Sequence, residues 1–195
     1  DHLYAKDFEY RKFGYAYFEV DVENLEPIQV FSSEATGEDI RKQIEKGGLD
    51  KCNAFVWHKV NAFESFEVGE YTVTPLTANH DMKLEPRLYI IQKDGKTMLY
   101  AHDTGWFPDD TWEYLKEKKP YFDYVSLDCT SILNDSRRNH MGIKCCSDVR
   151  DEFYKLGLAD SKTSFCLNHF SHNGRMTYDE LKELADTMGF LVSYD

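Results

Sequence analysis

The sequence predicts an α/β fold in which helices cover a mixed β-sheet. Strand-like and helix-like segments alternate in the second half of the chain, and residues of alternating polarity form hairpin patterns in the middle. At 195 residues the chain has about the length of one domain and can bury a substantial core. We therefore expect residues 1–195 to form a single domain.

Each element has a signal of its own. Apolar residues at helical spacing predict helices, alternation predicts half-buried strands, and the apolar run YVSLDCT predicts a buried strand. In the first half, the predicted elements are a helix over 3–18, a strand over 27–33, a helix from Gly37 to Lys46, antiparallel strands between 55 and 77, and a hairpin over 87–103. In the second half, they are a helix led by Pro108 and ending near Lys118, a strand over 124–130, a helix from Ser147 to Leu156, a strand over 164–168, a helix over 177–188 and a short strand over 190–194.

Turn and cap residues define several element ends. Asp94 and Gly95 are typical of a two-residue hairpin turn, so the second hairpin strand would lead to Asp103. Ser147 is the predicted N-cap of its helix. Thr177 begins a Thr-x-x-Glu capping box, in which two side chains satisfy free N–H groups at a helix start.

Charge and hydropathy limit the classes of partner. The net charge is -12, from 35 acidic and 23 basic residues, which disfavours binding along a nucleic-acid backbone or on a membrane surface. No apolar run approaches the roughly 20 residues that span a bilayer. We expect a small or locally docked substrate, no membrane partner, and a homodimer as a candidate assembly.

The cysteines indicate a reducing, cytoplasmic compartment. The chain has five of them, two are adjacent, and no CxxC pair occurs, so neither a disulfide framework nor a thiolate zinc site is indicated. Cys145 and Cys146 are expected to be small buried residues.

Histidines and aspartates recur where predicted strands end or a helix begins. They are Asp1, His2, His80, His102, Asp103, Asp128, His169 and His172. Imidazoles and carboxylates bind divalent metals, and one carboxylate can bridge two ions. Such ions lower the pKa of bound water and neutralise charge on an ester, so the pattern favours metal-dependent hydrolysis. Taken alone, each residue also fits a plainer role as a loop histidine or a turn-forming aspartate.

The order of these residues resembles the metallo-β-lactamase superfamily. Asp1-His2 ahead of an amphipathic helix resembles the second half of its HxHxDH signature, and the later ligands are matched in order by His80, by Asp103 in HDTG, and by His169 in NHFSHNG. The DTG, SLDCT, NHMG and HFS segments are most similar to the branch containing phosphoribosyl cyclic phosphodiesterases and ribonuclease Z enzymes. The resemblance covers the full chain and implies an αββα sandwich of mixed sheets flanked by helices.

The resemblance also implies ligands for two divalent metal ions, which could be zinc, manganese or iron. Asp1, His2 and His169 would bind one ion, His80 would bind the other, and Asp103 would bridge both. Asp1 would in addition take part in catalysis.

Further residues would face the substrate if the resemblance holds. His140 would be catalytic, donating a proton to the leaving-group oxygen or holding a phosphate, with a solvated loop position as the alternative. His172 is expected on the substrate side or in solvent. Arg137 and Arg138 would bind an anionic phosphate, or pair with surface carboxylates. Asp128 is either the partner of a ligand imidazole or a structural carboxylate.

The sequence departs from the family pattern at its start and beside one ligand. The two histidines that precede Asp1 in HxHxDH are absent, as are the family's opening strands, so we expect a fragment that begins inside this motif. His102 stands where the family usually has a small residue. With only His80 and Asp103, the first metal would have too few protein ligands for a closed site.

Three functions follow from this pattern. The leading expectation is a phosphodiesterase that uses metal-bound hydroxide on a small phosphodiester or another anionic substrate. A nuclease acting on RNA or DNA ends is the first alternative, although the acidic charge disfavours nucleic acid as a partner. A non-catalytic binding module is the second alternative, which the missing histidines favour.

Overall fold

A computed structural model describes residues 26–46 and 55–194 of the chain. The predicted helix over 3–18 lies outside the described residues. The chain divides into two compact units. The first holds the described residues up to Val60 together with residues 83–85, and the second holds residues 61–82 and 86–194. The single domain over residues 1–195 stays a prediction.

The first unit is a strand–helix–strand element. It consists of β1 (Ile28–Ser32), α2 (Glu34–Lys46) and β2 (Phe55–Lys59). The predicted strand over 27–33 is confirmed as β1. The prediction of an antiparallel strand is wrong for β2, which pairs with β1 in parallel. A connection that passes through a helix returns the chain in its original direction, which is what a parallel pair requires.

Helix α2 begins three residues before the predicted start at Gly37. Ser33 precedes the helix and caps it, since its hydroxyl accepts from the N–H of Thr36 at 3.3 Å. Gly37 lies inside the helix, where the Trp57 ring packs against it. A Cβ added at Gly37 would be 2.2 Å from that ring, so the position needs a glycine for this close contact and does not mark the start of the helix.

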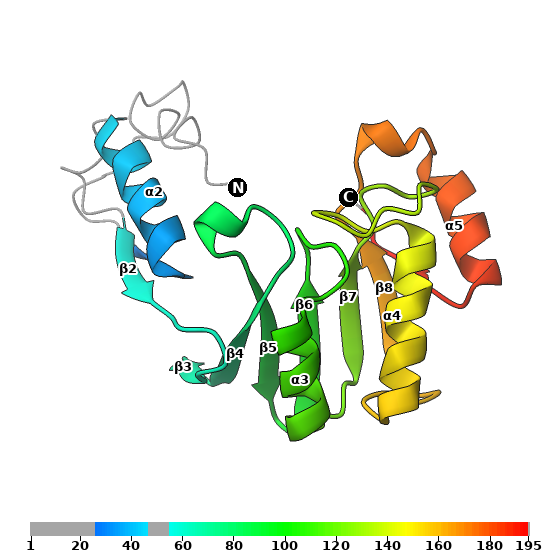
Figure 1. The fold of residues 1–195 in the computed structure, drawn as a ribbon, viewed down its shortest axis with the longest axis horizontal. Coiled ribbons are helices and arrows are strands. Elements are labelled where there is room, and N and C mark those ends of the chain that lie inside the picture. The colour runs from blue at the N-terminus through cyan, green and yellow to red at the C-terminus, as the bar shows by residue number, and fades with distance from the viewer. Residues whose placement is uncertain (1–25, 47–54, 195) are drawn as a thin grey trace. The chain divides into compact units, whose positions relative to one another are not determined.

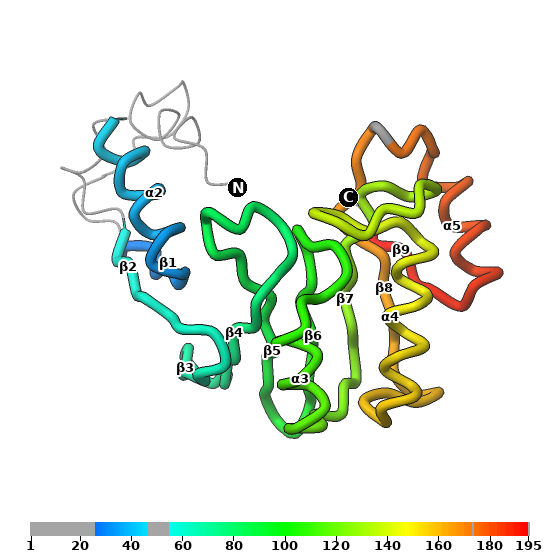
Figure 2. The backbone as a smooth tube through the Cα atoms, in the orientation of Figure 1, coloured from blue at the N-terminus to red at the C-terminus, as the bar shows by residue number. Residues whose placement is uncertain are grey.

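The second unit is built on a seven-stranded mixed sheet with the order β3-β4-β5-β6-β7-β8-β9. Its strands are β3 (Phe66–Val68), β4 (Tyr71–Thr77), β5 (Arg87–Lys93), β6 (Lys96–Ala101), β7 (Tyr124–Asp128), β8 (Ser164–Asn168) and β9 (Leu191–Val192). Neighbours from β3 to β6 are antiparallel, and neighbours from β6 to β9 are parallel. Figure 2 shows β6, β7 and β8 side by side. The predicted α/β class with a mixed sheet is confirmed.

Helices of the second unit cover this sheet. They are α3 (Asp109–Lys118), α4 (Ile143–Leu156) and α5 (Tyr178–Thr187), with a short 3₁₀ turn at η4 (His172–Gly174). A further 3₁₀ turn, η3 (Met82–Leu84), has two of its three residues in the first unit. In Figure 1, α3 and α4 lie over the same face of the sheet. Their aromatic side chains meet in the core, where Trp112 and Phe153 have ring centroids 5.9 Å apart. Within residues 26–46 and 55–194, no helix has both the length and the apolar composition needed to cross a membrane.

Most element ends agree with the sequence signals. Asp94 and Gly95 both have positive φ (51° and 72°), as a tight hairpin turn between β5 and β6 requires. Thr177 forms the predicted capping box with Glu180. The prediction of Ser147 as an N-cap is wrong, because α4 begins at Ile143 and the Ser147 hydroxyl donates to the Ile143 carbonyl inside the helix.

Apolar burial explains the earlier start of α4. Ile143, Cys145 and Cys146 are buried and extend the apolar face of the helix toward its N-terminus. The predicted burial of the two cysteines is thereby confirmed. The N-cap is Gly142, whose backbone lies against the preceding loop.

Replacing Gly142 with alanine is expected to lower the free energy of unfolding by about 2–3 kcal/mol. A Cβ there would lie 1.8 Å from the carbonyl oxygen of Asn134, a backbone atom that cannot rotate away. Gly157→Ala is the matched control, since Gly157 has φ 71° but no neighbouring atom within 4 Å, so only backbone strain of about 1 kcal/mol applies. Chemical denaturation measures both, and an equal loss in the two variants would contradict the packing argument.

Candidate metal centre

The carboxyl ends of β6, β7 and β8 meet at one edge of the sheet, because these strands are adjacent and parallel. Asp128 ends β7 and is paired with Asn168, which ends β8. His169 follows directly, and Asp103 lies two residues after β6. His80 follows β4, which runs antiparallel to β5 and ends at the same edge. Sheet topology thus gathers residues that are up to 89 positions apart in the sequence (80 to 169).

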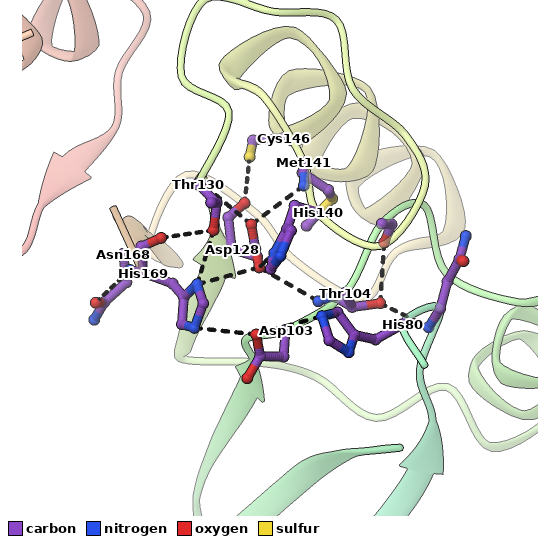
Figure 3. A network of polar contacts seen from close by, with 12 residues as sticks. His80, Asp103, Thr104, Asp128, Thr130, His140, Met141, Cys146, Asn168 and His169 are labelled. Carbon is purple, nitrogen blue, oxygen red and sulfur yellow. Dashed lines mark hydrogen bonds and ion pairs between the residues drawn. The ribbon is translucent and has the colours of Figure 1, made fainter. Parts of the chain in front are cut away.

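We define the His–Asp cluster as His80, Asp103, Asp128, His140 and His169 (Figure 3). Asp103 Oδ1 lies 3.2 Å from Nε2 of His169 and 3.8 Å from Nε2 of His80. One ligand atom from each of Asp103, Asp128, His140 and His169 lies within 4.8 Å of the other three. Carboxylate oxygens and imidazole nitrogens at this spacing fit zinc, manganese or iron, which accept this mixed donor set.

The backbone is strained at two cluster residues. Asp103 has φ 51° and His169 has φ 60°, both in the left-handed region that non-glycine residues rarely adopt. Such conformations cost about 1–3 kcal/mol each, persist only where the surrounding structure imposes them, and concentrate at functional sites. Asp94, in the turn between β5 and β6, has the same φ of 51° without belonging to the cluster, so the assignment of a metal centre rests on the side-chain geometry.

Asp128 is the buried anchor of the cluster. Its carboxylate is fully buried and accepts from the backbone N–H groups of Thr130 (3.0 Å), Met141 (3.2 Å) and Thr104 (3.4 Å). It also lies 2.8 Å from Nδ1 of His140. If Nδ1–H donates to this carboxylate, Nε2 of His140 is the nitrogen left to face a metal or a substrate.

Two groups lie beside Nδ1 of His169: Asp128 Oδ2 at 3.5 Å and, closer to it, Thr130. The Thr130 hydroxyl donates to the backbone oxygen of His169 at 2.7 Å and lies 2.7 Å from Nδ1 of the same residue. A hydroxyl has one proton, so it must accept from Nδ1–H, and Nε2 points at Asp103. The hydrogen bond from His169 lowers the pKa of Asp103 to about 2, and the same bond raises the pKa of His169. A bound metal ion would replace the proton on Nε2 of His169.

Thr130→Val is expected to weaken metal affinity by about 10–100-fold, because the His169 ring loses the hydroxyl that lies 2.7 Å from its Nδ1 and keeps only the more distant Asp128 Oδ2, at 3.5 Å, beside that nitrogen. Thr130→Ser keeps the hydroxyl and serves as the control. Titration of the metal-free protein with zinc against a competing chelator measures the affinity. Equal affinities for the valine and serine variants would show that the hydroxyl does not position His169.

The other predicted site residues lie in different surroundings. Arg137 pairs with Asp135 and Asp148, so its guanidinium is engaged by two carboxylates. Arg138 is exposed and precedes His140 by two residues in the sequence. His172 is exposed and lines a separate pocket, whose lining includes no member of the His–Asp cluster. Asp1 and His2 lie outside the described residues. The roles assigned to all of these residues stay predictions.

Two residues near the cluster have contacts that the sequence did not predict. Thr130 is one, and its position two residues after Asp128 is the only signal the sequence offers. His102 is the other, with Nε2 2.7 Å from the Ser126 hydroxyl and a ring centroid 5.9 Å from that of His169. Burial lowers the pKa of His102 to about 4, so it is neutral at neutral pH.

Comparisons with known proteins agree with the geometry. The sequence matches a family model described as Beta-lactamase superfamily domain over residues 19–189. No curated protein gives a significant sequence match. Among solved structures, the metallo-beta-lactamase fold protein YhfI from Bacillus subtilis aligns with TM-score 0.58 and 15% identity, covering 85% of this chain and 61% of YhfI.

Two further structures align similarly. A diphosphatase from the PhnP family gives TM-score 0.57 and 16% identity over 87% of this chain and 56% of its own. Zn²⁺-bound PqqB from Methylobacterium extorquens gives TM-score 0.56 and 13% identity over 89% of this chain and 65% of its own. At these identities the likeness shows a shared fold, and the chain spans less than two thirds of each of the three proteins.

Proposed function

The chain belongs to the metallo-β-lactamase superfamily, and we propose that it is a phosphodiesterase that hydrolyses a small phosphodiester with two divalent metal ions. A protein described as a metallo hydrolase and a diphosphatase are among the solved structures that share this fold. One observation supports the proposal most strongly: Nε2 atoms of two histidines from different segments converge on a single oxygen of Asp103.

Three of the described residues would bind the two metal ions. His80 and His169 would each hold one ion, and Asp103 would lie between them as the shared ligand, because its Oδ1 is near both Nε2 atoms. Bound ions of this kind lower the pKa of water and neutralise charge on a phosphodiester. Zinc, manganese and iron all accept these donors.

His140 would protonate the leaving-group oxygen. Asp128 Oδ2 lies 2.8 Å from its Nδ1 and orients the ring, so Nε2 can be presented to the substrate. Arg138, exposed nearby in the chain, would contact the phosphate, whereas the Arg137 guanidinium is already paired. Cytoplasmic location is part of the proposal, since Cys129, Cys145, Cys146 and Cys166 are free, buried thiols.

Metal-dependent hydrolysis of a chromogenic phosphodiester tests the function. The protein is stripped of metal, reloaded separately with zinc, manganese or ferrous iron, and assayed with bis(4-nitrophenyl) phosphate. Hydrolysis that requires the metal and is lost in His169→Asn supports the proposal, and asparagine is chosen because it tolerates the left-handed backbone. His58→Asn, at a histidine on β2 in the first unit, is the control. If the wild-type protein hydrolyses no substrate with any of the three ions, the proposed phosphodiesterase function is wrong.

A further inference from the structure

A pocket of about 310 Å³ lies beside the His–Asp cluster in the second unit. Its lining comes from the segments after β7 and β8, from the start of α5, and from the residues after β9. The lining residues are Ile132, Phe170, Ser171, His172, Met176, Thr177, Tyr178, Leu181, Ser193 and Tyr194. Phe170 directly follows His169, so their Cα atoms are about 3.8 Å apart. The pocket and the cluster therefore share one loop.

The lining combines apolar and aromatic side chains with the polar side chains of Ser171, His172, Thr177 and Ser193, and none of them carries a fixed charge. It holds three aromatic rings, from Phe170, Tyr178 and Tyr194, and no Asp, Glu, Lys or Arg. Thr177 is occupied by its own capping box, since its hydroxyl donates to Glu180 Oε2 at 2.9 Å. His172 is the one imidazole in the lining. The lining offers no permanently charged side chain to pair with a charged ligand group. A flat, uncharged ring could instead pack against the aromatic side chains in edge-to-face or stacked contacts.

Close contacts occur at and beside the pocket lining. Gly174, in the η4 turn, lies close to the Ile132 side chain, since a Cβ added to this glycine would be 2.3 Å from Ile132 Cδ1. Tyr178 and Tyr194 pack edge to face, with ring centroids 4.9 Å apart. A cavity of about 150 Å³ admits benzene, so this pocket has room for a larger ring system.

We infer that this pocket binds an uncharged aromatic or heteroaromatic group of the substrate while the phosphoester meets the His–Asp cluster. The placement of the phosphoester at the His–Asp cluster rests on the proposed function, whereas the binding of an aromatic group in the pocket does not. In this arrangement His172 contacts the edge of the ring system and not the phosphate. The substrate class is thereby narrowed to phosphoesters that carry an aromatic group.

Two measurements with Tyr178→Ala test the inference. Tyr154→Ala is the matched control, because both tyrosines lie on helices and are similarly exposed (37% and 43%), and Tyr154 does not line the pocket. First, phenylphosphonate and methylphosphonate, which carry the same anion, are compared as inhibitors of the metal-loaded protein. Second, 1-naphthol binding to the metal-free protein is followed by calorimetry, which needs neither metal nor activity.

Phenylphosphonate is expected to inhibit about tenfold more strongly than methylphosphonate, and Tyr178→Ala should reduce that ratio about threefold or more. Naphthol binding should weaken by a similar factor in Tyr178→Ala and remain unchanged in Tyr154→Ala. If Tyr178→Ala weakens naphthol binding but no phosphodiester is hydrolysed, the pocket stands and the proposed function fails. If hydrolysis occurs while both ligand preferences are unaffected by Tyr178→Ala, the function stands and the pocket assignment is overturned.

Discussion

Asp103→Asn is expected to lower phosphodiester hydrolysis about a thousandfold or more, while the protein remains folded. The carboxylate lies between His80 and His169, so its loss removes the shared ligand from both proposed ions. Charge stabilisation by such ions is worth several kcal/mol, and about 4 kcal/mol corresponds to a thousandfold in rate. Asparagine has the same shape and tolerates φ 51°, so the backbone can keep its conformation.

Asp94→Asn is the control for this variant. Asp94 also has φ 51°, but it lies in the turn between β5 and β6, at the opposite end of the hairpin from Asp103. Steady-state assays of both variants, with circular dichroism to check folding, measure the effect. Retention of wild-type activity in Asp103→Asn would exclude Asp103 as a metal ligand.

Asp128→Ala is expected to lower the free energy of unfolding by about 3–5 kcal/mol. The substitution removes a fully buried carboxylate and leaves the N–H groups of Thr130, Met141 and Thr104 without their acceptor. It also frees His140 from the contact that orients it. The loss is large because each buried N–H without a partner costs about 1–3 kcal/mol.

Two further variants separate this cost from a general effect of losing an aspartate. Asp128→Asn should be intermediate, since its amide oxygen can still accept from Thr130 and Met141 while its amide nitrogen meets only donors or the His140 ring. Asp123→Ala should cost only about 1 kcal/mol, because its partners Lys96 and the Thr97 N–H lie at a partly exposed edge. Chemical denaturation gives all three values. A loss in Asp128→Ala no larger than that in Asp123→Ala would contradict the role of Asp128 as a buried anchor.

The sequence was sufficient for the parts of the fold that depend on local periodicity. The apolar run at β7, the Asp94-Gly95 turn and the Thr177 capping box are local signals, and each was found where predicted. The convergence of His80, Asp103 and His169 could also be anticipated, because polar residues at parallel strand ends share one edge of a sheet. The resemblance to a known family supplied their expected roles.

Features that depend on distant contacts could not be read from the sequence. The Ser147 hydroxyl is a good cap in isolation, but burial of Ile143 and Cys145 extends α4 past it. Strand β2 pairs in parallel, because pairing partners are chosen by tertiary packing and not by alternation. Pairing of Arg137 with a carboxylate was one of the two alternatives, but its partner Asp148, eleven residues away, could not be identified from a local pattern.

The most direct test of the metal centre is the metal content of the purified protein after extensive dialysis, measured by elemental analysis alongside His169→Asn and the control His58→Asn. We expect bound zinc, manganese or iron in the wild-type protein and in His58→Asn, with a clear loss in His169→Asn. Equal metal content in all three, or none in the wild type even after reloading, would contradict a metal centre at the His–Asp cluster.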